Sequence, residues 1–319
     1  MSKPEPLLER KDNRFTLFPI DHQDIWEIYE SAIASFWTPH EIDLSQDLKD
    51  WETMGENEKH FIKNVLAFFA SADGIVNENL VKNFYDQIEN ATIRQVYVSQ
   101  MFIEGIHSHM YSLLIETYIR DEDEKHALFN SVETNPSIRK KAAWALRWID
   151  NGSFTQRLIA FAVVEGVFFS GAFCAIFWIK IYYEGKLNGL VNSNEFISRD
   201  EKLHCDTAVT IYRKLVNKLS EAEVHQIFRE AIALECEFIT EALPVSLIGM
   251  NAALMQQYIR FVGDFWLREL GYAPLYDASN PFPFMEWISL ETKANFFEIR
   301  PTNYAMAKKT VIEFDGDDF

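Results

Sequence analysis

The chain has 319 residues, 48% of them hydrophobic, with only 12 glycines and 10 prolines, which is enough apolar side chain for one large domain or two small ones. Its formal net charge of −18 argues against a protein that binds nucleic-acid phosphates, because such a protein needs a basic face. Three cysteines without a C-x-x-C pair, and an N-terminus without the apolar segment of a signal peptide, indicate a reduced, cytoplasmic chain.

The first half of the chain shows helical periodicity of its apolar residues, broken by a few turn signals. Residues 1–15 are polar and are expected to form a flexible N-terminal arm, and Pro39 interrupts the first helix. A connector with one short helical turn is expected over residues 43–51. The longer helices expected in this half cover residues 21–36, 58–89 and 91–120.

The second half of the chain continues with helices and polar turns, and no alternating strand pattern of useful length appears. Pro244 is expected to bend the end of a late helix. The helices expected here cover residues 137–150, 158–179, 193–218, 221–248 and 252–270. The sequence therefore predicts an all-α fold, in which residues 16–290 form one ferritin-like helical bundle with additional packed helices, followed by a flexible tail of residues 291–319.

Residues 158–179 form an apolar run of 22 residues that contains a single charge, Glu165. By length and hydropathy alone, such a run is a candidate for a transmembrane helix. However, a charge inside the run is costly in lipid, and no second run of this kind follows. A central helix that other helices surround is also apolar on all sides. We therefore interpret the run as the core helix of a soluble protein that does not enter a membrane.

Two glutamate–histidine pairs share one spacing along the chain. Glu104 and His107 are three residues apart, as are Glu201 and His204, so each pair lies on one face of a helix. Tyr111 follows His107 by four residues and stays on the same face. One such pair is a weak signal, because glutamate and histidine often lie on solvated helix faces. Two pairs in two expected helices are a stronger one.

Asp73 and Glu165 complete the pattern, because each is an isolated acid in a mostly apolar stretch of another expected helix. Two Glu-x-x-His pairs with one further carboxylate from each of two other helices match the known ligand set of di-iron and di-manganese bundle proteins. Carboxylates are costly to bury without a cation, and a set of carboxylates and imidazoles without thiolates favours iron or manganese over structural zinc. The expected division is Asp73, Glu104 and His107 on one ion and Glu165, Glu201 and His204 on the other, with some carboxylates bridging.

At these motifs the sequence resembles the small, radical-generating subunit of class I ribonucleotide reductase, most closely the eukaryotic-type chains. The resemblance extends from about Phe15 to the C-terminus. The matching stretches are residues 70–80, 106–114, 164–171, 197–205, 240–244 and 295–297. Because these stretches are long and follow the order of the family, the resemblance is highly specific.

The resemblance implies that Tyr111 carries a stable radical, although spacing alone favours a core tyrosine with a hydrogen-bonded hydroxyl. The implied cofactor is two iron ions, oxo-bridged when oxidised, with manganese as the alternative. A route for electrons and protons is implied through Trp51 and Asp200, where Asp200 would accept a hydrogen bond from the far ring nitrogen of His107. The resemblance also implies an apolar pocket around the radical, formed by Phe169, Phe173 and Ile197. Without the resemblance, these three would be interpreted as ordinary core residues.

The C-terminal tail has the composition of a flexible arm with an acidic end. The resemblance implies that this tail docks onto the large subunit, with Phe319 as its anchor and Tyr304 as a radical relay. It also implies a homodimer. The expected activity is reduction of ribonucleotides to deoxyribonucleotides, and it requires the large subunit, because the chain itself has no glycine-rich phosphate-binding loop.

Two other functions could use the same kind of centre. A di-iron oxidase or monooxygenase that acts directly on a small or lipid substrate would need the same six ligands, but it has no need for Trp51, Tyr304 or an acidic tail. A ferritin-type iron store would be a shorter chain. The reductase interpretation accounts for more of the sequence than either alternative.

Overall fold

A computed structural model describes residues 4–9, 16–243, 247 and 249–286 of the chain. Within these residues the fold is helical, and the one extended pairing is an isolated antiparallel bridge between Leu247 and Met250. The predicted all-α fold is therefore confirmed. The helical elements are α1 (Gln23–Ala34), η1 (Pro39–Glu41), α2 (Asp47–Thr53), α3 (Glu56–Asn79), η2 (Leu80–Tyr85), α4 (Ala91–Tyr118), α5 (Glu122–Phe129), α6 (Ser131–Thr134), α7 (Pro136–Asn151), α8 (Phe154–Val163), η3 (Val164–Phe168), α9 (Ser170–Tyr182), α10 (Asn188–Lys214), α11 (Glu221–Ala242) and α12 (Ala252–Leu270).

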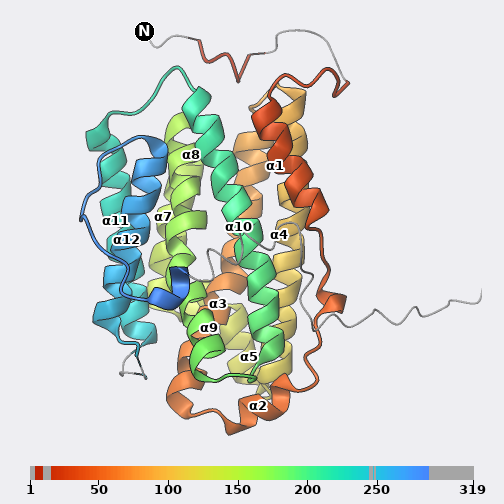
Figure 1. Cartoon of the computed structure of the whole chain (residues 1–319), viewed down its shortest axis with the longest axis vertical. Helices are drawn as coiled ribbons and strands as arrows, with labels where there is room; N and C mark the ends of the chain where they lie inside the picture. Colours follow the sequence, from red (N-terminus) through yellow and green to blue (C-terminus); the bar gives the residue numbers. More distant parts are fainter. Residues whose placement is uncertain (1–3, 10–15, 244–246, 248, 287–319) are drawn as a thin grey trace, which may run out of the picture.

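The long helices form a bundle that runs along the long axis of the molecule (Figure 1). At its centre, α3, α4, α10 and the continuous run α8–η3–α9 pack against one another. Helix α1 covers the outside of α4 and α10 at the right of the view, whereas α7, α11 and α12 lie on the other side. This arrangement is a ferritin-like four-helix core with additional helices packed around it.

Polar caps determine where several of these helices begin. At the start of α4, the Asn90 side chain accepts hydrogen bonds from the backbone N–H groups of Thr92 and Ile93. Helix α11 begins with a reciprocal capping box between Ser220 and Glu223. Such caps satisfy N–H groups that have no partner within the helix. Both helices begin where the sequence predicted.

The predicted end of α11 near residue 248 is wrong, because the helix ends at Ala242. The next residue, Leu243, has a φ of −116° and a ψ of 69°, outside the helical region. Leu243 precedes Pro244, and the proline ring disfavours helical dihedral angles in the residue before it. The proline therefore ends this helix instead of bending it.

Helix α10 begins at Asn188, about one turn earlier than predicted. Its first N–H groups are capped from a distant element, because Asp47 of α2 accepts hydrogen bonds from the backbone of Gly189 and Leu190, each at 2.9 Å. Helix starts are usually recognised from a cap a few residues upstream. Here the cap lies far away in the sequence, so local patterns do not reveal it.

Two helices contain a π-helical turn that the sequence analysis did not predict. The turn η2 ends the helix expected over residues 58–89, and η3 divides the apolar run into α8 and α9. A π-helical turn often lies at a functional site. Glu165 lies in η3, in the middle of the apolar run.

The apolar run from Phe154 to Tyr182 is long and hydrophobic enough to cross a membrane, and among the described residues it is the one helix for which this holds. In the fold, 94% of its most hydrophobic window is buried. Its place inside the bundle (Figure 1) explains why it is apolar on every side. The interpretation of this run as a core helix is confirmed.

Candidate metal centre

Six predicted ligands meet in the interior of the bundle, and four helical elements supply them. They are Asp73 of α3, Glu104 and His107 of α4, Glu165 of η3, and Glu201 and His204 of α10. None of these residues is more than 5% exposed to solvent. The i, i+3 spacing therefore places both glutamate–histidine pairs on interior helix faces, as predicted.

Two imidazoles and two carboxylates form the middle of this cluster. Nδ1 of His204 lies 2.8 Å from Oε1 of Glu104 and 2.9 Å from Oε2 of Glu201. Nδ1 of His107 lies 3.0 Å from Oε1 of Glu201 and 3.5 Å from Oε2 of Glu104. Each glutamate thus lies close to both histidines, so each could be shared between two ions.

Glu165 and Asp73 extend the cluster in two directions. Ligand atoms of Glu104, Glu165, Glu201 and His204 all lie within 4.8 Å of one another, so they could hold one ion. Asp73 is outside this group, and the charges that act most strongly on it are those of Glu104 and His107. This geometry fits the expected division, in which Asp73 and His107 share an ion and Glu165 and His204 share the other.

Burial and mutual repulsion act strongly on the ionisable groups of the cluster. Burial and the neighbouring carboxylate of Glu104 raise the pKa of Asp73 well above its usual value. Burial and the carboxylates of Glu201 and Glu104 raise the pKa of Glu165 in the same way. For His204, burial alone would lower the pKa, but Glu104 and Glu201 outweigh it and raise the pKa to about 9. The raised pKa values of Asp73 and Glu165 mean that their ionised forms are costly here, and a bound cation would offset that cost.

The donor set fits a cofactor of two metal ions. Buried side-chain atoms without a hydrogen-bond partner include both carboxylate oxygens of Asp73, Glu104 and Glu165. Nδ1 of His107 and Oε1 of Glu201 also belong to this set, although the two atoms lie 3.0 Å apart. Unpartnered polar atoms in a native core need an explanation, and bound cations supply one. Two divalent ions would also neutralise four carboxylates, and oxygen and imidazole donors suit iron or manganese.

Asp200 connects the cluster to a tryptophan. Its Oδ2 atom lies 3.2 Å from Nε2 of His107, which is the contact expected from the sequence. The same oxygen accepts a 2.8 Å hydrogen bond from the indole N–H of Trp37. The indole also stacks on the His107 ring, with the ring centroids 6.3 Å apart. A continuous chain of contacts therefore runs from a predicted metal ligand to Trp37.

The tryptophan that hydrogen-bonds Asp200 is Trp37, and not Trp51, the tryptophan expected on this route. Trp51 lies in α2 and stacks on Tyr118, with the ring centroids 4.9 Å apart. Trp37 lies beyond the end of α1 and is 163 residues from Asp200 in the sequence. Helical spacing does not relate segments that far apart, so no pattern within the sequence selects Trp37 over Trp51.

Tyr111 is fully buried on α4. Its hydroxyl donates a 3.0 Å hydrogen bond to Oδ1 of Asn194 on α10. Burial, with the carboxylate of Asp73 nearby, raises the pKa of Tyr111 well above its usual value, so the phenol keeps its proton. Asn194 was missed by the sequence analysis, although it precedes Glu201 by seven residues and therefore shares a helix face with that ligand.

An aromatic cluster surrounds Tyr111. The ring of Phe69 stacks on Tyr111 at a centroid distance of 4.5 Å and an interplanar angle of 4°. Phe169 and Phe173 contact Phe69 in turn, at centroid distances of 5.3 and 5.0 Å. Ile197 is fully buried in the same core. The predicted pocket residues thus lie in the core that contains Tyr111, and the structure adds Phe69, whose stacking no sequence pattern indicated.

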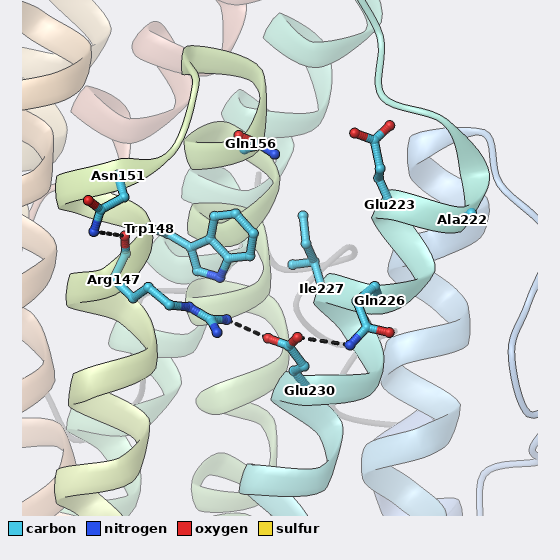
Figure 2. A pocket seen from close by; sticks show the side chains of 9 residues that line it. All are labelled: Arg147, Trp148, Asn151, Gln156, Ala222, Glu223, Gln226, Ile227 and Glu230. Atoms are coloured by element: carbon cyan, nitrogen blue, oxygen red, sulfur yellow. Dashed lines mark hydrogen bonds and ion pairs between the residues drawn. The ribbon is translucent and has the colours of Figure 1, made fainter.

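Two predicted residues fall outside the described part of the chain, and a groove on the outside of the bundle is separate from this centre. Tyr304 and Phe319 are outside the described residues. A groove of about 520 Å³ lies on the outside, where α7 faces α11 (Figure 2). Across it, Arg147 pairs with Glu230, which also accepts a hydrogen bond from Gln226. None of the predicted site residues lines this groove, so it is not the metal centre.

Curated proteins of similar sequence are reductase small chains. The model of the family described as "Ribonucleotide reductase, small chain" matches residues 14–281. The ribonucleoside-diphosphate reductase small chain of Nicotiana tabacum is 55% identical over 304 residues, which cover 95% of this chain and 92% of that one. The ribonucleoside-diphosphate reductase subunit M2 of Homo sapiens is 53% identical over 302 residues, which cover 94% of this chain and 77% of that one.

Solved structures agree with these sequence matches. The ribonucleotide reductase Rnr4 homodimer of Saccharomyces cerevisiae is 34% identical with a TM-score of 0.81, covering 91% of this chain and 92% of that one. The ribonucleotide reductase R2 subunit of Clostridium botulinum has a TM-score of 0.79 at 21% identity, covering 88% of this chain and 91% of that one, and shows the shared fold. The sequence matches, the family match and the buried donor cluster agree. This chain belongs to the ribonucleotide reductase small-chain family.

Proposed function

We propose that this chain is the small subunit of a class I ribonucleoside-diphosphate reductase, which generates a radical on Tyr111, stores it there and passes it to the large subunit. The observation that carries the proposal is the buried cluster of four carboxylates and two imidazoles beside a buried, protonated phenol. The large subunit would bind the ribonucleotide and reduce it to the deoxyribonucleotide. The chain is inactive without that partner.

The proposed cofactor is two iron ions, with manganese as the alternative that the same donors allow. Asp73 and His107 would hold one ion and Glu165 and His204 the other. Glu104 and Glu201 are the bridging candidates, because each contacts both histidines. When bound, such a metal pair supplies, with oxygen, the oxidising power needed to remove a hydrogen atom from a phenol.

The residues around Tyr111 define how a radical would be kept. Asn194 accepts the phenol's hydrogen bond and so fixes the direction in which the hydroxyl points. Phe69 covers one face of the ring, and Phe169 and Phe173 pack behind Phe69. Because this cluster is apolar and closed to solvent, it excludes the water and small reductants that would quench a radical.

The proposed route out of the centre runs through His107, Asp200 and Trp37. Asp200 contacts the far ring nitrogen of His107 and the indole N–H of Trp37, so it links the two rings and offers a place for a proton. This assignment replaces Trp51 as the tryptophan of the route. Tyr304 remains the proposed relay in the tail, and Phe319 the proposed anchor on the large subunit.

The proposed oligomer is a homodimer through the outer face of α1 and α4. Four large apolar side chains are exposed there: Ile33, Phe36, Val98 and Phe102. Phe36 and Phe102 stack on each other with their centroids 5.9 Å apart, so they form a continuous patch. Exposed apolar patches mark interaction surfaces, and a similar chain of known structure is a homodimer.

The free, buried cysteines suit the cytoplasm, which is the proposed location.

The test of this function is Tyr111→Phe. The variant removes one hydroxyl and leaves Asn194 without its donor, but it changes none of the six ligands, so the protein should still bind two ions. It should form no stable radical and should give no turnover with the large subunit. Metal analysis, EPR and an assay of deoxyribonucleotide formation measure the three properties. Full turnover by Tyr111→Phe would contradict the role of this tyrosine.

A further inference from the structure

A buried ion pair joins α7 to α11 beside the metal centre. Lys141 is 1% exposed and Glu235 is fully buried, and Nζ of the lysine lies 2.5 Å from Oε2 of the glutamate. Removing two charges from water is costly, and apolar residues of similar volume often give equal or greater stability. A role other than stability would account for such a pair in this core.

Lys141 also contacts the helical turn that carries Glu165. Its ammonium group donates a 3.1 Å hydrogen bond to the carbonyl oxygen of Phe168, the last residue of η3. The same group lies over the rings of Phe68 and Phe238, at 3.2 and 4.3 Å from their centroids. Because Phe168 follows Glu165 by three residues, the carbonyl that Lys141 holds is about one turn from a predicted metal ligand.

The end of η3 uses side chains as hydrogen-bond donors. A π-helical turn shifts the backbone register, so carbonyl oxygens at its end need donors from outside the regular helix pattern. The carbonyl of Val167 accepts a 2.7 Å hydrogen bond from the hydroxyl of Ser170, and that of Phe168 accepts one from Lys141. The second donor comes from another helix and therefore ties η3 to α7.

Two glycines bring neighbouring helices against the same segment. A β-carbon at Gly166 would overlap the indole of Trp266 on α12. A β-carbon at Gly171 would lie 2.6 Å from Oε1 of Glu235. The segment is thus held by close packing at both glycines, and Lys141 holds the carbonyl between them.

We propose that Lys141 and Glu235 position Glu165 for metal binding, Lys141 by holding the carbonyl of Phe168 and Glu235 by orienting Lys141. This inference rests on the proposed function, since it concerns one ligand of that metal centre. The pair acts through the backbone of η3 and is not itself a ligand. A cavity of about 20 Å³, lined in part by Lys141, Val164 and Phe168, lies beside the turn.

The test replaces the pair and measures metal binding by the complete chain. Lys141→Met/Glu235→Leu removes both charges and keeps most of the volume, so no buried charge is left alone. Metal-free protein is titrated with manganous ion without oxygen, and the EPR signal of the free ion reports how many ions bind and how tightly. We expect two ions per wild-type chain, and in the double variant one site weakened by about tenfold or more, as for other residues that orient a ligand.

Two control variants separate positioning from general stability. Glu235→Gln keeps the shape of the pair and an oxygen that accepts from Lys141, so the lysine nitrogen stays oriented and can still donate to Phe168. Burial favours the neutral amine, so no lone buried charge is required, and both sites should bind as in the wild type. Lys140→Met/Glu237→Leu removes an exposed ion pair between the same two helices and should also bind both ions normally. If the apolar double variant does not fold, Lys141→Gln/Glu235→Gln takes its place, because a glutamine side chain is one atom too short to reach Phe168.

Three results would overturn the proposal. They are unchanged affinity at both sites in the double variant, an equal loss in Glu235→Gln, and an equal loss in Lys140→Met/Glu237→Leu. A wild-type chain that binds fewer than two ions would instead contradict the proposed function. The failure of the positioning role is therefore distinguishable from the failure of the metal centre.

Discussion

The acids of the metal centre and Tyr111 are buried in different ways. Both oxygens of Asp73 and of Glu165 lack a hydrogen-bond partner, whereas the Tyr111 hydroxyl donates to Asn194. The acids therefore need cations to be stable in the core, and the phenol does not. Loss of the phenol hydroxyl should therefore leave metal binding intact, whereas loss of a ligand should weaken metal binding.

The choice between the two tryptophans is open to a direct test. Trp37→Phe keeps an aromatic ring but removes the indole N–H that donates to Asp200. We expect this variant to form the Tyr111 radical and to lose most of its turnover with the large subunit, because the proposed route leads through Trp37. Trp51→Phe changes a ring that stacks on Tyr118 and should keep most of the turnover.

The rate of deoxyribonucleotide formation and the EPR amplitude of the radical check both variants. Normal turnover by Trp37→Phe together with loss in Trp51→Phe would return the route to Trp51. Loss in both variants with an intact radical would mean that the two segments act together.

At the scale of helices, the sequence was most informative where a pattern repeats within one element. The i, i+3 spacing identified Glu104 with His107 and Glu201 with His204, and the isolated acids Asp73 and Glu165 were identified by their apolar surroundings. Helices α4, α11 and α12 begin where the sequence predicted. In each case one helix carries all the information.

Features that depend on two distant elements were not predictable in this way. The contact of Trp37 with Asp200 and the cap that Asp47 places on α10 each join segments far apart in the sequence. The π-helical turn at Glu165 has no side-chain pattern of its own, because it adds one residue to an already apolar run. Packing between helices determines these features, and a single sequence does not show packing.

The pair of Lys141 and Glu235 gives stability a defined pH dependence. Burial lowers the pKa of Lys141 to about 8, although Glu235 opposes this, and burial raises the pKa of Glu235 to about 7, although Lys141 opposes that. The raised pKa of Glu235 stabilises the fold below pH 4.5, and this contribution is lost as the pH rises through about 7. The lowered pKa of Lys141 stabilises the fold above pH 10.5, and this contribution is lost as the pH falls through about 8.

The pair should therefore contribute least between pH 7 and 8. We predict that the free energy of unfolding of metal-free Lys141→Met/Glu235→Leu exceeds that of the metal-free wild type by the largest amount in this window. The difference should shrink toward both lower and higher pH. Urea unfolding of the two proteins across the pH range measures it, and a difference that does not depend on pH would contradict the assignment.

For the whole molecule, the apolar patch on α1 and α4 predicts a dimer that one charge can disrupt. Phe102 is 62% exposed in the single chain, and Phe102→Asp would place a carboxylate in the proposed interface. We expect this variant to be monomeric at concentrations where the wild type is dimeric, because an unpaired buried charge is costly.

Phe129→Asp is the matched control, because Phe129 is also exposed but lies on α5, away from the patch. This control should remain dimeric. Sedimentation of the three proteins decides the question. A dimeric Phe102→Asp variant with normal stability would exclude this face as the interface.

The tail supplies a second prediction at this scale. Deleting residues 313–319 should leave the metal centre and the radical unchanged, because none of the six ligands or the aromatic cluster lies there. The complex with the large subunit should weaken, since the proposed anchor Phe319 is removed. A binding titration against the large subunit checks this, and unchanged affinity would reject the proposed docking role.

The central claim is that six buried side chains hold two metal ions that allow oxidation of Tyr111. The measurement that tests it most directly starts from metal-free wild-type protein, loaded with ferrous iron and exposed to oxygen, with low-temperature EPR and visible absorption spectra recorded afterwards. The prediction is a tyrosyl radical signal beside ferric absorption bands, with the radical absent from Tyr111→Phe. Metal uptake without a radical, with manganese as well as iron, would contradict the radical function, and no metal uptake would contradict the six-ligand centre itself.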